Sequence, residues 1–202
     1  MEFVSFAEAW PELEAGGVLP VDDAVPLPPP PPAVLATLDL ALDEVAACYR
    51  IAASAEGLDL AAEERLLPVE SSALAESLDH LLHKLHLTPV AAMPRARWRA
   101  ILDAVGFSLA EHRGWQDLEA EATLVLNTRD ALVCGPADLR TLRTVVEALL
   151  LDGQTHDDGL VVIPTSASLL AEILPGPTPS IRIEVASAPM AASVRELLAA
   201  DA

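Results

Sequence analysis

The sequence predicts an α+β protein, in which a helical N-terminal region is followed by a small mixed β-sheet (ββαβαβα) covered by helices. Apolar residues recur at helical spacing up to residue 113, whereas short runs typical of strands begin after Trp115. The chain has 202 residues and is 52% hydrophobic, so it can bury a core without disulfides or a metal. We therefore divide it into an acidic arm with a proline-rich linker (1–32), a helical region (33–114) and an α/β region (115–202).

The arm begins with a short amphipathic segment that carries Phe3, Phe6 and Trp10. A run of five prolines, from Pro28 to Pro32, follows at its end. Consecutive prolines favour the polyproline II conformation, which predicts a stiff linker. A ligand for a proline-binding groove is the alternative. We expect the arm to be a separate element that docks on a partner or on a second copy of the chain.

Four segments of the helical region have apolar residues at a spacing of three and four, which places these residues on one helix face. Asp59 is a signal for the start of a helix, and Gly57, Pro68 and Gly114 are signals for the end of one. The predicted helices are 33–56, 59–67, 70–87 and 94–113.

The α/β region alternates between apolar runs of four to six residues and longer amphipathic segments. Gly135 and Pro136 mark the start of its first helix, and Gly153 marks the end of that helix. The predicted elements are strands 123–126 and 131–134, a helix from 136 to 150, strand 160–163, helix 166–174, strand 181–185 and helix 189–200.

The charge of the chain excludes several classes of partner. It has 31 acidic and 12 basic residues, for a formal charge of -19. Phosphate backbones and anionic membranes repel such a chain, so we expect neither nucleic acid nor membrane as a partner. No basic, apolar leader is present and no stretch reaches the roughly 18 apolar residues of a membrane span, so we expect a cytoplasmic protein. Cys48 and Cys134 are isolated, which predicts reduced core thiols.

Charges are distributed unevenly along the sequence. The first 49 residues contain nine acids and no base, and Asp39, Asp43 and Glu44 belong to this group. The one concentration of bases is formed by Arg95, Arg97 and Arg99 around Trp98. These arginines could pair with the carboxylates of the protein itself, contact an acidic partner surface, or bind nucleic acid; we favour them in that order.

The familiar catalytic motifs are absent from the sequence: it has no nucleophile elbow, phosphate-binding loop, dinucleotide fingerprint or paired C-x-x-C. One arrangement resembles a metal site. Glu76, His80 and His83 follow one another at i, i+4 and i+7, and this spacing places them on one stripe of a helix. Such a stripe could hold Zn or another transition metal. The alternatives are a solvated polar face, which we favour, and a surface that responds to pH.

These observations lead to one function and one alternative. We expect a non-enzymatic cytoplasmic interaction module, such as an accessory, adaptor, immunity-type or chaperone-like subunit, whose acidic helical surface meets a basic protein or a second copy of itself. The alternative is a metal-dependent enzyme or metal-responsive regulator that uses Glu76, His80 and His83. The residues predicted to bind the partner are Phe3, Phe6, Trp10, Asp39, Asp43, Glu44, Arg95, Arg97, Trp98 and Arg99.

Overall fold

The computed structural model describes residues 1–15, 18–22, 47–51, 65–66, 71–167, 169–185 and 188–200. The predicted partner-binding residues Asp39, Asp43 and Glu44 lie outside these ranges, and so do residues 23–32 of the predicted linker.

The described residues form helices and strands in the following order. The helices are α1 (Phe6–Ala15), α3 (Ser71–Lys84), α4 (Trp98–Leu109), α5 (Arg113–Ala122), α6 (Leu139–Asp152) and α7 (Ala188–Ala200), with short 3-10 turns η3 (Pro136–Asp138) and η4 (His156–Asp158). The strands are β1 (Glu2–Val4), β2 (Val18–Asp22), β3 (Ala47–Ile51), β4 (Arg65–Leu66), β5 (Val90–Pro94), β6 (Ala131–Cys134), β7 (Leu160–Pro164), β8 (Leu169–Leu174) and β9 (Ser180–Val185).

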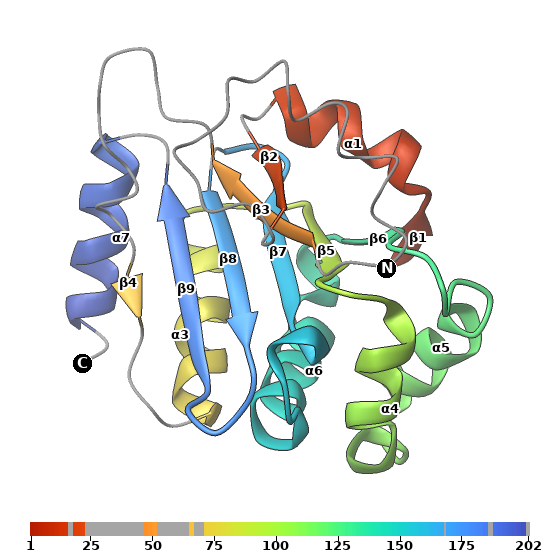
Figure 1. Cartoon of the computed structure of the whole chain (residues 1–202). Coiled ribbons are helices and arrows are strands. Elements are labelled where there is room, and N and C mark those ends of the chain that lie inside the picture. Colours follow the sequence, from red (N-terminus) through yellow and green to blue (C-terminus); the bar gives the residue numbers. More distant parts are fainter. Residues whose placement is uncertain are drawn as a thin grey trace.

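Seven of the strands form one sheet in the order β1-β6-β5-β7-β8-β9-β4 (Figure 1). Every neighbouring pair in this sheet is antiparallel. Strands β2 and β3 form a separate antiparallel pair. The predicted α+β class is confirmed, but the sheet is antiparallel and larger than the small mixed sheet expected from the sequence.

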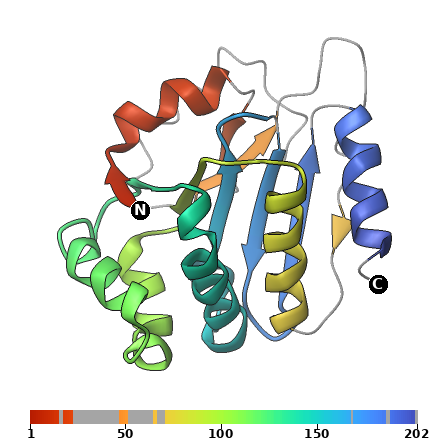
Figure 2. The same cartoon turned by 180° about the vertical axis from the view of Figure 1, so that it is seen from behind.

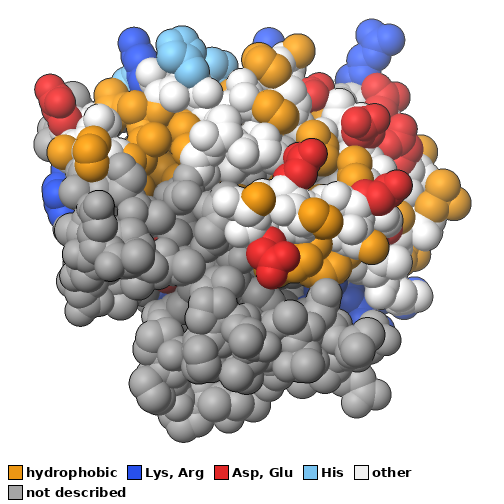
Figure 3. Space-filling view, turned by 90° about the horizontal axis from the view of Figure 1, so that it is seen from above, with side chains coloured by type: hydrophobic (Ala, Val, Ile, Leu, Met, Phe, Trp, Pro, Cys, Tyr) orange, Lys and Arg blue, Asp and Glu red, His pale blue; other side chains and the backbone are white. Residues whose placement is uncertain are grey.

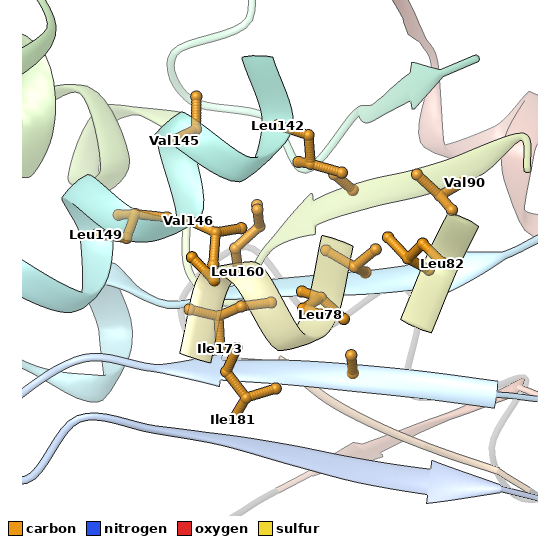
Figure 4. Packing of buried hydrophobic residues seen from close by; sticks show 14 of the residues in the cluster. Leu78, Leu82, Val90, Leu142, Val145, Val146, Leu149, Leu160, Ile173 and Ile181 are labelled. Carbon is orange, nitrogen blue, oxygen red and sulfur yellow. The ribbon is translucent and has the colours of Figure 1, made fainter. Parts of the chain in front are cut away.

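Helices α3 and α6 lie side by side on one face of the sheet (Figure 2). Their apolar stripes meet the strands in the main hydrophobic core, which Figure 4 shows from close by. A fully buried side chain of this size contributes about 1.5–3 kcal/mol, so this layer holds the helices on the sheet. The centre of the core includes Leu78 and Leu82 from α3, Val146 and Leu149 from α6, and Leu160 and Ile173 from the sheet.

The opposite face of the sheet carries a second, smaller core. Strands β5 and β7 contribute Met93 and Ile163 to it, and α1 contributes Leu13. Phe6 and Trp10 of α1 pack against this cluster, and their rings stack with centroids 5.3 Å apart. Helix α1 therefore packs on the face of the sheet opposite α3 and α6.

The first strand also ties the arm to the sheet. Strand β1 pairs with β6, so that Glu2 lies opposite Val133. The backbone N–H of Phe6 donates a hydrogen bond of 3.2 Å to the Asp130 carboxylate. In this structure, residues 1–15 are an integral part of the folded body, whereas the sequence predicts a separate arm.

Two buried strands were not predicted from the sequence. Strand β5 lies between the predicted helices 70–87 and 94–113 and overlaps the second of them at Pro94, and β8 falls within the predicted helix 166–174. All residues of β5 and β8 are buried. Neither run alternates regularly between polar and apolar residues, and each has a single β-branched residue, whereas the equally buried β7 has three and was predicted as a strand.

The region around α5 also differs from the prediction. Residues 123–126, predicted to be a strand, form turns after α5, and the N–H of Thr123 donates to the carbonyl of Glu119 as the helix ends. Gly114 lies inside α5, although it was predicted to end a helix. A Cβ atom at Gly114 would lie 2.7 Å from Oγ1 of Thr141 on α6. Close contact between helices therefore explains this glycine.

The first two predicted helices are contradicted where the structure describes them. Residues 47–51 of the predicted helix 33–56 form strand β3, and residues 65–66 of the predicted helix 59–67 form strand β4. The rest of both segments lies outside the described residues. In contrast, the predicted elements around α3, α6, β6, β7, β9 and α7 are confirmed.

Candidate functional site

A depression of about 560 Å³ lies between α3 and α6. The predicted stripe of α3 forms one wall of this depression, and α6 contributes a basic side chain from the other side. Its lining residues are Ala73, Glu76, Ser77, Asp79, His80, His83 and Arg143. The helical stripe identified from the sequence therefore borders a real concavity, in which Arg143 is an additional residue that the sequence pattern did not indicate.

Ion pairs in the depression are weak. The Arg143 guanidinium lies 3.8 Å from a carboxylate oxygen of Glu76, and the side chain of Glu76 is 68% exposed. Nδ1 of His83 lies 3.2 Å from Oδ1 of Asp79 and 3.0 Å from the Asp79 carbonyl oxygen. The pair of Arg143 and Glu76 is exposed, and such pairs contribute about 0–1 kcal/mol, because water screens them and the long side chains lose entropy. It can exchange with other partners at little cost, whereas Oδ1 of Asp79 is buried.

The metal hypothesis receives no support from this geometry. Within the described ranges, no group of three or more His, Cys, Asp and Glu side chains is arranged to hold a metal ion. Glu76 faces Arg143, and Nδ1 of His83 faces Asp79. The stripe has the spacing of a metal site, but its potential ligands contact other groups rather than converging on a common point.

Arg95, predicted to bind a partner, lies inside the protein. Its guanidinium donates to the Glu172 carboxylate, and both side chains are almost completely buried. Arg182, which lies opposite Glu172 on β9, contacts the other carboxylate oxygen at 3.3 Å. Internal pairing, the interpretation we favoured for the arginines, is therefore found for Arg95. Glu172 was not identified from the sequence, because it is 77 positions away from Arg95.

The residues next to Arg95 take different positions. Trp98 is buried, and its indole N–H donates a hydrogen bond of 2.8 Å to the Asp130 carbonyl oxygen. Arg99 is exposed and Arg97 is half-buried. Of these residues, Arg99 is the one whose side chain is open to a partner.

The aromatic residues of the predicted arm also face inward. Phe3 meets Trp98 edge to face, and Phe6 and Trp10 pack on the second core. All three side chains are half-buried rather than exposed. Binding of a partner through these rings stays a prediction, and it would require access to surfaces that the protein itself partly covers.

The most exposed aromatic side chain in the described structure was missed by the sequence reasoning. Phe107 on α4 is 97% exposed. At about 100° per residue it lies opposite Trp98, on the outer face of the helix. Asp103, which is also exposed, lies one turn before it on α4, and the exposed Glu111 follows in the turn after the helix. A helical projection of residues 98–109 could have identified Phe107, because it is the large apolar residue that lies outside the buried stripe.

Helix α5 lies next to α4 and is also acidic. Residues 98–122 contain five carboxylates and two arginines, and Asp117 and Glu121 are exposed on consecutive turns of α5. We call this pair of helices the acidic hairpin. Figure 3, which views the molecule from above, shows several acidic side chains gathered on one side of this face, with some basic side chains beside them.

The buried thiol of Cys134 is unreactive. Burial raises the pKa of Cys134 to about 12, and the nearby Asp138 carboxylate acts in the same direction. A thiol with this pKa carries almost no thiolate at neutral pH, and the thiolate is the reactive form. Cys134 is a free cysteine and is part of the main core.

In the described part of the chain, none of the helices combines the length and apolar character that crossing a membrane requires. Comparison with known proteins finds no match: no family model fits the chain, and no curated protein or solved structure shows significant similarity to it.

Proposed function

We propose that the protein is a non-enzymatic, cytoplasmic interaction module whose acidic hairpin binds a basic segment of another protein. The observation that carries this proposal is Phe107, which is almost fully exposed and flanked by Asp103 and Glu111. An exposed phenylalanine gains stability when a partner covers it, because an aromatic ring has a large apolar surface.

The charges around Phe107 define the chemistry of the partner. Asp103, Glu111, Asp117 and Glu121 are all exposed on the acidic hairpin, whose five carboxylates outnumber its two arginines, so this segment carries a net negative charge. A partner with lysines or arginines around an apolar pocket would satisfy both features. Its charges would accelerate and orient the encounter, and the pocket around the ring would supply most of the affinity.

Site-specific cross-linking tests this proposal. A photoreactive phenylalanine analogue at position 107 of the full chain, expressed in its host, should cross-link to one protein partner. Mass spectrometry then identifies the cross-linked segment, which we expect to be basic and to contain apolar residues. The matched control has the same analogue at Leu151, which is 64% exposed on α6 and lies outside the acidic hairpin.

Affinity measurements with the purified partner complete the test. Phe107→Ser should weaken binding about thirtyfold, because central aromatic residues of interfaces contribute about 2 kcal/mol or more. Asp117→Asn with Glu121→Gln should mainly slow association and reduce its salt dependence. Leu151→Ser should leave the affinity unchanged. A cross-link to a second copy of the chain, or equal cross-linking from positions 107 and 151, would show that the proposal is wrong.

A further inference from the structure

We infer that the depression between α3 and α6 is a binding site for a small molecule that carries a carboxylate or phosphate group, with Arg143 as its main anchor. The inference is independent of the acidic hairpin, which lies on α4 and α5. It rests on the hydrogen-bonding groups that line the depression.

Arg143 is poorly satisfied in the structure. Among the described residues, its guanidinium forms one ion pair, the 3.8 Å contact to Glu76, and no hydrogen bond. The side chain is 34% exposed, and its nitrogens are not among the buried unpartnered atoms of the described residues, so the guanidinium remains accessible to a ligand. A guanidinium offers five N–H donors in a planar fork, which matches the two oxygens of a carboxylate or phosphate.

Ser77 supplies a second donor to the same depression. In the part of the chain that the structure describes, its hydroxyl forms no hydrogen bond, although a serine within a helix often donates to the carbonyl four residues earlier. The Ser77 side chain is half-buried in the wall formed by α3. An oxyanion held by Arg143 would give this hydroxyl an acceptor.

His83 supplies a third nitrogen-bearing side chain to the depression. His83 also lines the depression, and its Nδ1 faces Asp79. This contact engages Nδ1 and leaves Nε2 of the same ring as a further nitrogen that can face a ligand.

Glu76 acts as an internal competitor in this arrangement. Its carboxylate occupies the position beside Arg143 that a ligand carboxylate or phosphate would take, but the contact is long and the side chain is mostly exposed. An incoming anion would displace Glu76 into water rather than break a strong bond. The volume of about 560 Å³ suits a small molecule, because ligand pockets are typically about 300–1,000 Å³.

Titration with inorganic phosphate and, separately, with succinate tests the site in the full chain at constant ionic strength. The readouts are the NMR signals of the Arg143 side-chain Nε–H and of the His83 ring, and the two titrations distinguish phosphate from carboxylate ligands. Saturable shifts of both signals with either anion support the inference. The absence of saturation with both anions would overturn it.

Two substitutions should have opposite effects. Arg143→Met should weaken binding about tenfold or more, because it removes charge-assisted hydrogen bonds. Glu76→Gln should tighten binding up to about fivefold, because it removes the competing carboxylate. Thermal unfolding followed by circular dichroism establishes that each variant is folded. If Arg143→Met does not fold, the affinity of Glu76→Gln still tests the inference.

Two controls separate a specific site from general attraction. Arg140→Met removes an exposed arginine from the same helix, outside the depression, and should not change the affinity. Glu111→Gln removes one exposed carboxylate from the acidic hairpin and should also have no effect. Equal losses for Arg140→Met and Arg143→Met, or equal gains for Glu111→Gln and Glu76→Gln, would refute the inference.

Discussion

Phe3 lies edge-on to Trp98, with the ring centroids 5.1 Å apart and the ring planes at 87°. This contact joins strand β1 to the first turn of α4, which are far apart in the sequence. Edge-to-face pairs contribute about 0.5–1.5 kcal/mol beyond the burial of their surfaces, so the pair helps to hold the first residues on the body of the protein.

Replacing Phe3 by alanine should therefore destabilise the protein. We expect a loss of about 1–3 kcal/mol in the free energy of unfolding, from the aromatic contact and from the apolar surface that Phe3 buries. Urea denaturation measures this loss. Phe107→Ala is the matched control, because it removes the same ring from an exposed position and should change stability by less than about 0.5 kcal/mol. Equal losses for both variants would contradict the role of Phe3.

The two buried tryptophans should respond differently to substitution by phenylalanine. The indole N–H of Trp98 donates to the Asp130 carbonyl oxygen, whereas that of Trp115 has no hydrogen-bond partner among the described residues. Trp98→Phe removes a bond, and Trp115→Phe removes a donor that is already unsatisfied. Because an unsatisfied buried donor is unfavourable by about 1–3 kcal/mol, we expect Trp98→Phe to be the more destabilising variant in urea denaturation.

The buried charge cluster should be sensitive to loss of its acid. Glu172→Gln removes the carboxylate that Arg95 and Arg182 both contact, so positive charge is left in a buried site. Breaking a buried ion pair in this way typically destabilises a protein by about 3–5 kcal/mol. Glu111→Gln changes the net charge equally at an exposed position and should be nearly neutral. Chemical denaturation of both variants gives the comparison, and similar stabilities would argue against a structural role for Glu172.

Stability should depend on pH through the ion pair between the Met1 ammonium and Asp138, whose atoms lie 2.9 Å apart. Burial acts to raise the pKa of Asp138, but the hydrogen bonds from Met1 and from the Gly135 N–H outweigh it, and the folded-state pKa lies below the usual 3.8. The hydrogen bond to Asp138 is the main cause that raises the pKa of the Met1 ammonium above its usual 8.0. Each partner therefore favours the charged form of the other.

The sign of each shift determines the pH window. The contribution of Asp138 is present above its unfolded-state pKa and is lost as the pH falls through the lowered value. The contribution of Met1 is present below its unfolded-state pKa and is lost as the pH rises through the raised value. Asp138→Asn should therefore cost about 0.5–1 kcal/mol between these limits and less outside them, because the pair is partly exposed. A stability difference that does not change from acidic to alkaline pH would contradict this assignment.

Elements with one face exposed to water could be predicted from the sequence, and so could β7, whose buried run is rich in β-branched residues, whereas the buried strands β5 and β8 could not. Helix α3 presents Leu78 to the core and Glu76 to water, so its period is visible. Strand β8 has the run from Leu169 to Leu174 covered on both sides, and its one acid, Glu172, resembles a polar helix position until its partner Arg95 is known. Pairing across 77 residues is a tertiary property, and local periodicity carries no information about it.

The candidate sites likewise contain residues that could be placed from the sequence and one that could not. The i, i+4, i+7 spacing correctly placed Glu76, His80 and His83 along one wall of a depression. Arg143, which lies beside Glu76 in that depression, comes from another helix and could not be inferred from spacing. Phe107 was accessible to sequence reasoning, because its position opposite the buried stripe of α4 follows from helix geometry alone.

The place of β1 at the edge of the sheet has a consequence for protein synthesis. Phe6 finds its acceptor, Asp130, 124 residues later in the chain, and β1 pairs with a strand that begins at Ala131. The ribosome therefore releases the apolar side chains of residues 1–15 long before their binding surface exists. While translation continues, these side chains face water or molecular chaperones, and such transient exposure favours aggregation. Fusing a solubilising domain ahead of Met1 should raise the yield of soluble protein for this reason.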